Sequence, residues 1–164
     1  MTLTEMLLPE FDHEMRTTRT VLERTPAQDA AWRPHPRSTS LGDLAMHLAT
    51  IPRWLVPTLR QTELDLAPRP GMAPTPFESV DKLLAMFDEN VRDARAALAE
   101  ARDADYGVPW TLKAAGNTIF TMPRGPVIRS FILSHMIHHR GQLTVYLRLR
   151  DVPLPPVYGP TADA

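Results

Sequence analysis

Apolar residues recur at three- and four-residue intervals along four stretches of this sequence, and that spacing predicts four amphipathic helices. Three stretches cover residues 2–24, 40–60 and 77–102, and the last begins near 124–126 and reaches about residue 150. Each predicted helix carries one apolar stripe, which has to be buried against another element. Four such stripes in one short chain predict a four-helix bundle.

The prolines indicate where these helices end. Most of the 17 prolines fall between the four stretches, in groups at 34–36, 68–76 and 153–156. Proline ends helices because it lacks an N–H and clashes with the preceding turn. We expect the group at 68–76 to be a proline-rich linker. Pro52 and Pro57 fall inside the second stretch, where we expect them to kink the helix.

The connection at 106–122 is the one part of the pattern that does not look helical. Two short runs of β-branched and aromatic residues flank Gly116 and Asn117 there, so the segment forms either a short β-hairpin or an irregular connection. Pro109 argues against a central strand. The expected fold class is therefore all-α, with a single bundle domain over residues 1–164.

Composition and charge narrow the classes of function. The chain has 164 residues, of which 43% are hydrophobic, so it can bury a core without disulfides or other staples. Its formal net charge of −1 gives no basic surface for nucleic acid or an anionic membrane, and we expect neither partner. No apolar run is long enough for a membrane span, and no signal peptide is evident. These features predict a cytoplasmic protein.

Three histidines in the last predicted helix are the strongest chemical signal. At about 100° per residue, His135 and His139 fall near the middle of the apolar stripe, His138 falls at its edge, and Arg140 points away. Burying imidazole costs free energy unless its nitrogens are hydrogen-bonded or bound to a metal. The i, i+4 spacing lets two imidazoles converge on one ion. Core histidines satisfied by other side chains or by a substrate remain the alternative interpretation.

A metal site needs a third ligand, and three histidines are left to supply it. His13 lies opposite the apolar stripe of the first helix, and His35 lies between prolines in a loop, so we expect both at the surface. His47 lies at the flank of the apolar stripe of the second helix, on the same side as Trp54. His47 is therefore the best placed of the three. Three histidine ligands would leave coordination positions open, as in catalytic sites.

Other residues near these histidines have two interpretations each. Gln142 returns to the same face one turn after His139, where it forms a hydrogen bond either to a ligand group or between helices. Trp54 either lines an apolar pocket beside the metal or belongs to the core. We expect Arg140 at the surface or in a dimer contact. Gly141 lies in mid-helix, which predicts close approach of another helix.

These motifs together resemble a known family. His47 within Leu44-Ala-Met-His47-Leu, followed by His135-x-x-x-His139-Arg-Gly-Gln142-Leu, is similar to the DinB (damage-inducible, YfiT-like) superfamily. Further similar segments are Trp32-Arg-Pro34, Val108-Pro-Trp110 and Val152-Pro…Val157-Tyr-Gly-Pro160. The resemblance implies a four-helix bundle, frequently a dimer, with one divalent metal on His47, His135 and His139. His138 would then be a neighbour outside the triad.

The resemblance also implies a class of chemistry. Several members of the superfamily are thiol-dependent transferases and isomerases that use low-molecular-weight thiols such as bacillithiol or mycothiol. The chain has no cysteine, so a thiol would have to come from outside. We therefore expect a metal-dependent enzyme that activates such a thiol or water, of S-transferase or hydrolase type, acting on a small-molecule substrate. The alternative is a non-catalytic metal-binding stress-response protein.

The identity of the metal is less defined than its ligands. Nitrogen ligands suit zinc, nickel, copper or iron, and among these zinc, nickel or iron is the expected cofactor. No residue stands out as a general base.

Overall fold

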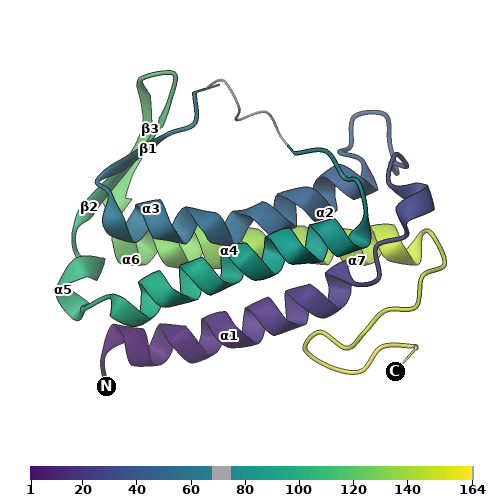
Figure 1. Ribbon diagram of the computed structural model, residues 1–164, viewed down its shortest axis with the longest axis horizontal. Helices are drawn as coiled ribbons and strands as arrows, with labels where there is room; N and C mark the ends of the chain where they lie inside the picture. Colours follow the sequence, from purple (N-terminus) through teal and green to yellow (C-terminus); the bar gives the residue numbers. More distant parts are fainter. Residues whose placement is uncertain (68–74, 164) are drawn as a thin grey trace.

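A computed structural model of the chain describes residues 1–67 and 75–163. Figure 1 shows four long helical segments lying side by side, with a small sheet at one end of them. The chain is thus mostly helical and also contains three short strands. The proline-rich linker predicted at 68–76 lies outside the described residues except for its last two positions.

The first segment is helix α1, Leu3–Leu22. Thr2 begins it with a capping box, since its hydroxyl accepts a hydrogen bond from the backbone N–H of Glu5 and the Glu5 carboxylate accepts one from Thr2. The apolar stripe that faces the other helices includes the fully buried Phe11 and Leu22. The prediction for residues 2–24 agrees with this helix.

The second segment is divided into three pieces. Helix α2, Leu41–Thr50, is followed by a 3₁₀ turn, η2, over Ile51–Trp54, and then by helix α3, Leu55–Arg60. Pro52 lies in the 3₁₀ turn, where the continuous helix of the prediction is interrupted. Pro57 lies in the first turn of α3, whose N–H groups have no helical partner in any case.

The third segment is helix α4, Val80–Glu100, which Ser79 caps by accepting a hydrogen bond from the backbone N–H of Lys82. It packs against α1, α2 and α3, and Figure 1 shows it between α1 and the segment formed by α2 and α3. Two short turns, η1 (Ala27–Asp29) and α5 (Asp103–Tyr106), connect the longer segments.

The last segment changes its helix type along its length. Helix α6, Arg124–Pro126, leads into a π-helical stretch, η3, over Val127–Ser134, and the α-helix α7 then runs over His135–Arg148. In a π-helix each N–H bonds to the carbonyl five residues earlier, so each residue turns the chain through a smaller angle than in an α-helix. This stretch therefore shifts every later side chain relative to the uniform 100° pattern.

The sheet corrects the all-α expectation. Its strands are β1 (Glu63–Asp65), β2 (Pro109–Ala114) and β3 (Asn117–Pro123). β2 pairs antiparallel with β3, and the unpredicted β1 pairs parallel with β2. Gly116, with φ of 80°, makes the turn between β2 and β3. The fully buried Trp110 of β2 attaches the sheet to the helices, because its indole N–H donates to the Pro57 carbonyl at 3.2 Å.

One large apolar core joins all four helical segments, and a smaller cluster around Trp110, Leu112 and Val127 lies under the sheet. The larger core includes Leu44 and Leu48 of α2, which places α2 firmly against its neighbours. Within the described residues no helix combines the length and the apolar character that a membrane span requires.

Candidate metal centre

Two helices place the three predicted histidines opposite one another. His47 lies in the last turn of α2, where its carbonyl accepts hydrogen bonds from the backbone N–H of Ile51 and from the Thr50 hydroxyl at 2.8 Å. His135 begins α7 directly after the π-helical stretch, and His139 follows one turn later. All three imidazoles are partly buried between the helices.

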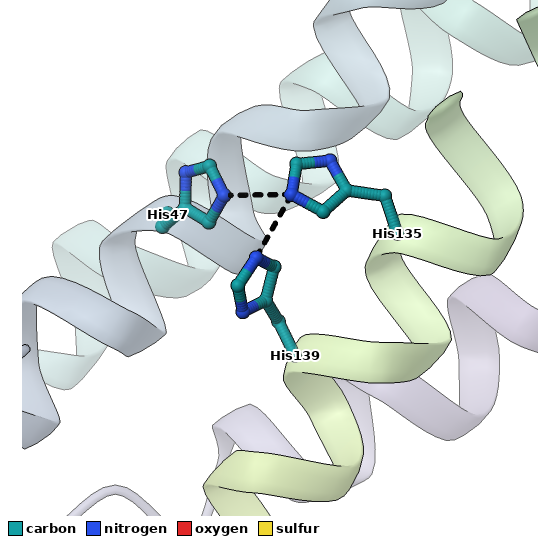
Figure 2. A group of neighbouring side chains, drawn as sticks. All are labelled: His47, His135 and His139. Carbon is teal, nitrogen blue, oxygen red and sulfur yellow. Dashed lines mark hydrogen bonds between the residues drawn. The ribbon is translucent and has the colours of Figure 1, made fainter. Parts of the chain in front are cut away.

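The three imidazoles present their Nε2 atoms to one another. Nε2 of His135 lies 3.3 Å from Nε2 of His47 and 2.8 Å from Nε2 of His139. One ring nitrogen from each residue lies within 4.8 Å of the other two. Figure 2 shows the rings of the three residues pointing toward a common centre. The three histidines are therefore arranged so that they could hold one metal ion.

The surroundings keep these imidazoles neutral. Burial, followed by the repulsion that protonated His139 and His135 would exert, lowers the pKa of His47 to about 4. Burial is also the main cause that lowers the pKa of His135 and of His139. At neutral pH each ring thus has an unprotonated nitrogen, which is the form that binds metal ions.

The outer nitrogens of the triad differ in their hydrogen bonding. Nδ1 of His139 lies 2.7 Å from Oε1 of Gln142. Because that oxygen only accepts, Nδ1 carries the ring proton and Nε2 presents its lone pair to the centre. Nδ1 of His135 is buried without a hydrogen-bond partner of good geometry among the described residues, although the Phe131 backbone acts to raise the pKa of His135 against the effect of burial.

This donor set fits a divalent metal better than it fits a closed hydrogen-bonded core. An imidazole Nε2–H of one ring can satisfy one neighbour, but three neutral rings that converge on one point leave lone pairs facing each other. A cation at that point satisfies all three lone pairs at once. The chain therefore supplies three nitrogen ligands of the kind that zinc, nickel, copper and iron accept.

A cavity of about 520 Å³ opens beside the triad. Helix α7 contributes His139, Gln142 and Tyr146 to its wall, α2 contributes Leu44 and His47, and the loop before α2 contributes residues 37–39. The volume lies within the range of small-molecule sites. Two of the three candidate ligands thus face a space that a small molecule can enter.

Aromatic side chains lie against another side of the triad. The Trp54 ring stacks on Phe131, with ring centroids 4.9 Å and planes 17° apart. The same two rings lie 5.9 Å and 5.8 Å from the His135 ring. Trp54 is partly buried at the edge of the main core, so it belongs to the core and also lies next to the candidate ligands.

The remaining histidines lie outside the centre. His138 is exposed and meets His139 edge to face at 4.9 Å, away from the three converging nitrogens. His13 is exposed on α1, as expected from its position opposite the apolar stripe. His35 is exposed in the loop, where its Nδ1 accepts a hydrogen bond from the backbone N–H of Arg37 at 3.1 Å.

The position of Arg140 differs from the sequence-based prediction, which placed its side chain at the surface or in a dimer contact. Its side chain is 1% exposed and forms an ion pair of 2.7 Å with the buried Glu14. Its guanidinium also donates to Tyr158 at 2.5 Å and to Thr18 at 3.2 Å. The π-helical stretch changes the phase of α7, which is why a uniform helical pattern places this residue at the surface.

The surroundings of Gly141 also differ from the sequence-based prediction. The residue is exposed, and a Cβ atom built on it would meet nothing within 4 Å. The close approach of another helix predicted at this position is therefore wrong. The prediction rested on the cost of glycine inside a helix, and that cost by itself does not indicate which face of the helix the glycine occupies.

The chain is similar to several known proteins. A model of the DinB superfamily matches residues 10–143, which is most of the chain. The uncharacterized protein YrdA of Bacillus subtilis (strain 168) is 40% identical over 42 residues, which are 26% of this chain and only 25% of that protein. The crystal structure of a DinB-like protein from Bacillus cereus ATCC 10987 is 25% identical with a TM-score of 0.73, over 96% of this chain and 98% of that one. The fold of the DinB-like protein YjoA from Bacillus subtilis is also similar, with a TM-score of 0.71 at 16% identity, over 93% of this chain and 96% of that one.

Proposed function

The chain belongs to the DinB superfamily, and on this basis we propose that it is an enzyme that binds one divalent metal ion on His47, His135 and His139. We propose that the metal serves to activate a low-molecular-weight thiol or water, in a reaction of S-transferase or hydrolase type. The observation that carries this proposal is the convergence of three neutral imidazole nitrogens within 4.8 Å beside a cavity of about 520 Å³.

The ligand set decides what the metal can contribute. A divalent cation lowers the pKa of a thiol or water that coordinates it and so supplies a nucleophile at neutral pH. Three protein ligands leave room for such a molecule, as in catalytic sites with three histidines. The chain has no cysteine, so the thiol in this proposal is a second substrate.

The protein's own residues prepare the site for this role. Gln142 holds the ring proton of His139 on Nδ1, which fixes the orientation of that ligand. The stacked rings of Trp54 and Phe131 lie next to the His135 ring, and neither of them lines the cavity. Such apolar cover limits the access of water and strengthens electrostatic interactions at the centre.

The family also supports a proposal about assembly and location. We propose that the four long helical segments form a four-helix bundle of the DinB type and that the protein acts in the cytoplasm as a homodimer. The resemblance and the side-by-side arrangement of the segments support the bundle, and the resemblance alone supports the dimer. Light scattering after size-exclusion chromatography measures the mass of the assembly, and a mass of one chain would contradict the dimer.

Elemental analysis tests the metal site most directly. We expect the purified protein to contain, or to take up on titration, about one zinc, nickel or iron ion per chain. His135→Ala should lower the affinity by more than about 100-fold, since loss of a ligand should exceed the 10- to 100-fold effect typical of outer groups. His138→Ala is the matched control, because that imidazole lies on the same helix outside the triad. A chain that binds no divalent metal, or a His135→Ala variant that binds as wild type does, contradicts the proposal.

Turnover is a separate question and needs its own assay. The metal-loaded protein is incubated with a panel of low-molecular-weight thiols and an electrophilic substrate, and with activated esters for hydrolysis. We expect turnover that His135→Ala abolishes. A protein that binds one metal yet turns over no thiol or ester would instead be the non-catalytic metal-binding protein of the alternative hypothesis.

A further inference from the structure

The loop at residues 37–39 forms part of the cavity wall, and the proposed chemistry does not use it. Arg37, Ser38 and Thr39 line the cavity together with His47 and His139. The loop thus brings a cationic side chain and two hydroxyl-bearing residues to the same space as two candidate ligands. The segments that resemble the DinB superfamily do not include Arg37, Ser38 or Thr39.

These groups have no partner within the described chain. The Arg37 guanidinium forms no ion pair and no hydrogen bond with any described residue, and the hydroxyl groups of Ser38 and Thr39 form no hydrogen bond there either. By contrast, Arg129, Arg140, Arg148 and several other arginines are paired with carboxylates. Among the described residues, Arg37 is therefore an unpaired cation in the wall of the cavity.

The loop that carries Arg37 is held in place from both sides. The Nδ1 atom of His35 accepts from the backbone N–H of Arg37 at 3.1 Å, and the His35 carbonyl accepts from the backbone N–H of Ser38 at 2.9 Å. The Trp32 carbonyl accepts from the N–H of Leu41 at 2.8 Å, which closes the base of the loop against α2. These bonds hold the backbone of Arg37 in place and lower the entropy cost of binding there.

Among the described residues that line the cavity, the charged side chain is that of Arg37. No aspartate or glutamate is among the described residues that line it. Arg37 carries one positive charge, and a divalent cation on the triad would add two. Such a site attracts anionic molecules. When a neutral molecule binds instead, no negative charge balances the positive charge of the site.

From these observations we infer that the cavity binds a small molecule that carries a carboxylate, with the Arg37 guanidinium binding that carboxylate and the reactive end directed at the histidines. This inference depends on the proposed function only where it assigns a role to the reactive end of the ligand. A guanidinium matches a carboxylate through two parallel N–H···O bonds, so the class of ligand is a small organic acid. The hydroxyls of Ser38 and Thr39 supply further donors beside it.

Isothermal titration of the zinc-loaded protein with matched ligands tests this assignment. The probes are 3-mercaptopropionate and its uncharged counterpart 3-mercaptopropionamide, which differ only at the group that Arg37 would bind. Propionate and inorganic phosphate, each without a thiol, show whether the anion is recognised independently of sulfur and whether a tetrahedral oxyanion also binds. The variants are Arg37→Gln, Arg37→Lys and, as a matched control, Arg33→Gln, since Arg33 is also exposed and unpaired in the described chain but does not line the cavity.

We expect wild type to bind the acid about tenfold more tightly than the amide, as loss of a charge-assisted hydrogen bond predicts. Arg37→Gln should reduce this preference several-fold, because only the charge of the metal then attracts the carboxylate, while its affinity for the amide and its zinc content stay unchanged. Arg37→Lys should keep part of the preference, and Arg33→Gln should keep all of it. Equal affinities of wild type for acid and amide, or an undiminished preference in Arg37→Gln, overturn the inference.

A further measurement distinguishes failure of the metal site from failure of the carboxylate site. If zinc does not bind to wild type, the proposed function fails, and the metal-free protein is titrated with propionate and followed by amide NMR shifts of residues 37–39. Saturable shifts that Arg37→Gln abolishes support the carboxylate site on its own. Shifts that are absent, or equal in Arg37→Gln, overturn it.

Discussion

Two polar clusters lie on different sides of α7, and the consecutive residues His139 and Arg140 each belong to one of them. His139 points to the triad between α7 and α2, while Arg140 points to Glu14 of α1 and to Tyr158 of the C-terminal tail. Both clusters bring polar groups into the interior of a protein that is otherwise apolar there. The two clusters differ in how many of these polar groups have hydrogen-bond or ion-pair partners.

The Arg140 cluster is fully satisfied. Its guanidinium meets the Glu14 carboxylate, the Glu14 carbonyl, the Thr18 hydroxyl and the Tyr158 hydroxyl, and the Tyr158 hydroxyl in turn donates to Glu14 at 3.0 Å. The triad instead has three neutral imidazoles whose nitrogens face one point, and Nδ1 of His135 has no good partner. Groups that satisfy one another stabilise a fold, whereas groups that converge unsatisfied are prepared for a ligand.

The largest expected effect tests the structural side of this comparison. Arg140→Ala should lower the free energy of unfolding by about 3–5 kcal/mol, because it leaves the Glu14 carboxylate buried without its partner. Urea denaturation at pH 7 measures the change. Arg148→Ala is the control, since Arg148 forms an ion pair with Asp163 that is partly exposed to solvent, and its loss should cost less than about 1 kcal/mol. Similar losses in both variants would show that the buried cluster has no special structural role.

An intermediate effect tests the functional side. Gln142→Ala should weaken metal binding by about tenfold, because Gln142 no longer holds the ring proton of His139 on Nδ1. Competition with a chelating dye measures the affinity, and the free energy of unfolding of the metal-free protein should change little because Gln142 is exposed. His138→Ala is the control on the same helix and should leave the affinity unchanged. Equal weakening in both variants would contradict the role of Gln142.

The smallest expected effect concerns pH. The pKa of His47 is about 4 in the folded protein and ordinarily 6.5, so between these values the unfolded chain binds a proton that the folded chain does not. The stability of the metal-free protein should therefore fall as pH is lowered from 7 to 5, by on the order of 1 kcal/mol for this partly exposed group. Urea denaturation at both pH values measures the fall, and His47→Asn should make it smaller. An unchanged fall in the variant would show that His47 is not responsible.

Much of the fold could be predicted because its signals are local. The spacing of apolar residues located all four helical segments, since an amphipathic helix is defined by neighbours three and four positions apart. The same local geometry indicated that His135 and His139 share one face. The strand β1 could not be predicted in this way, because only three residues, Glu63–Asp65, pair with a strand almost 50 positions away.

The π-helical stretch at Val127–Ser134 marks the limit of such local patterns. A uniform helix predicts that Arg140 faces solvent, but its side chain is 1% exposed. Nothing in the apolar spacing signals that hydrogen bonds here span five residues instead of four. The phase of everything after the stretch therefore depends on how the segment packs against the other helices.

The sequence alone determined that the protein is mostly helical and that two histidines of its last helix share one face. Tertiary structure decided that His47, rather than His13 or His35, faces that pair, and that Arg37 shares its cavity. It also decided that Arg140 faces Glu14, a residue 126 positions away along the chain. The physical reason is range: periodicity reports which face of a helix a residue occupies, but only the packing of helices determines what lies opposite that face.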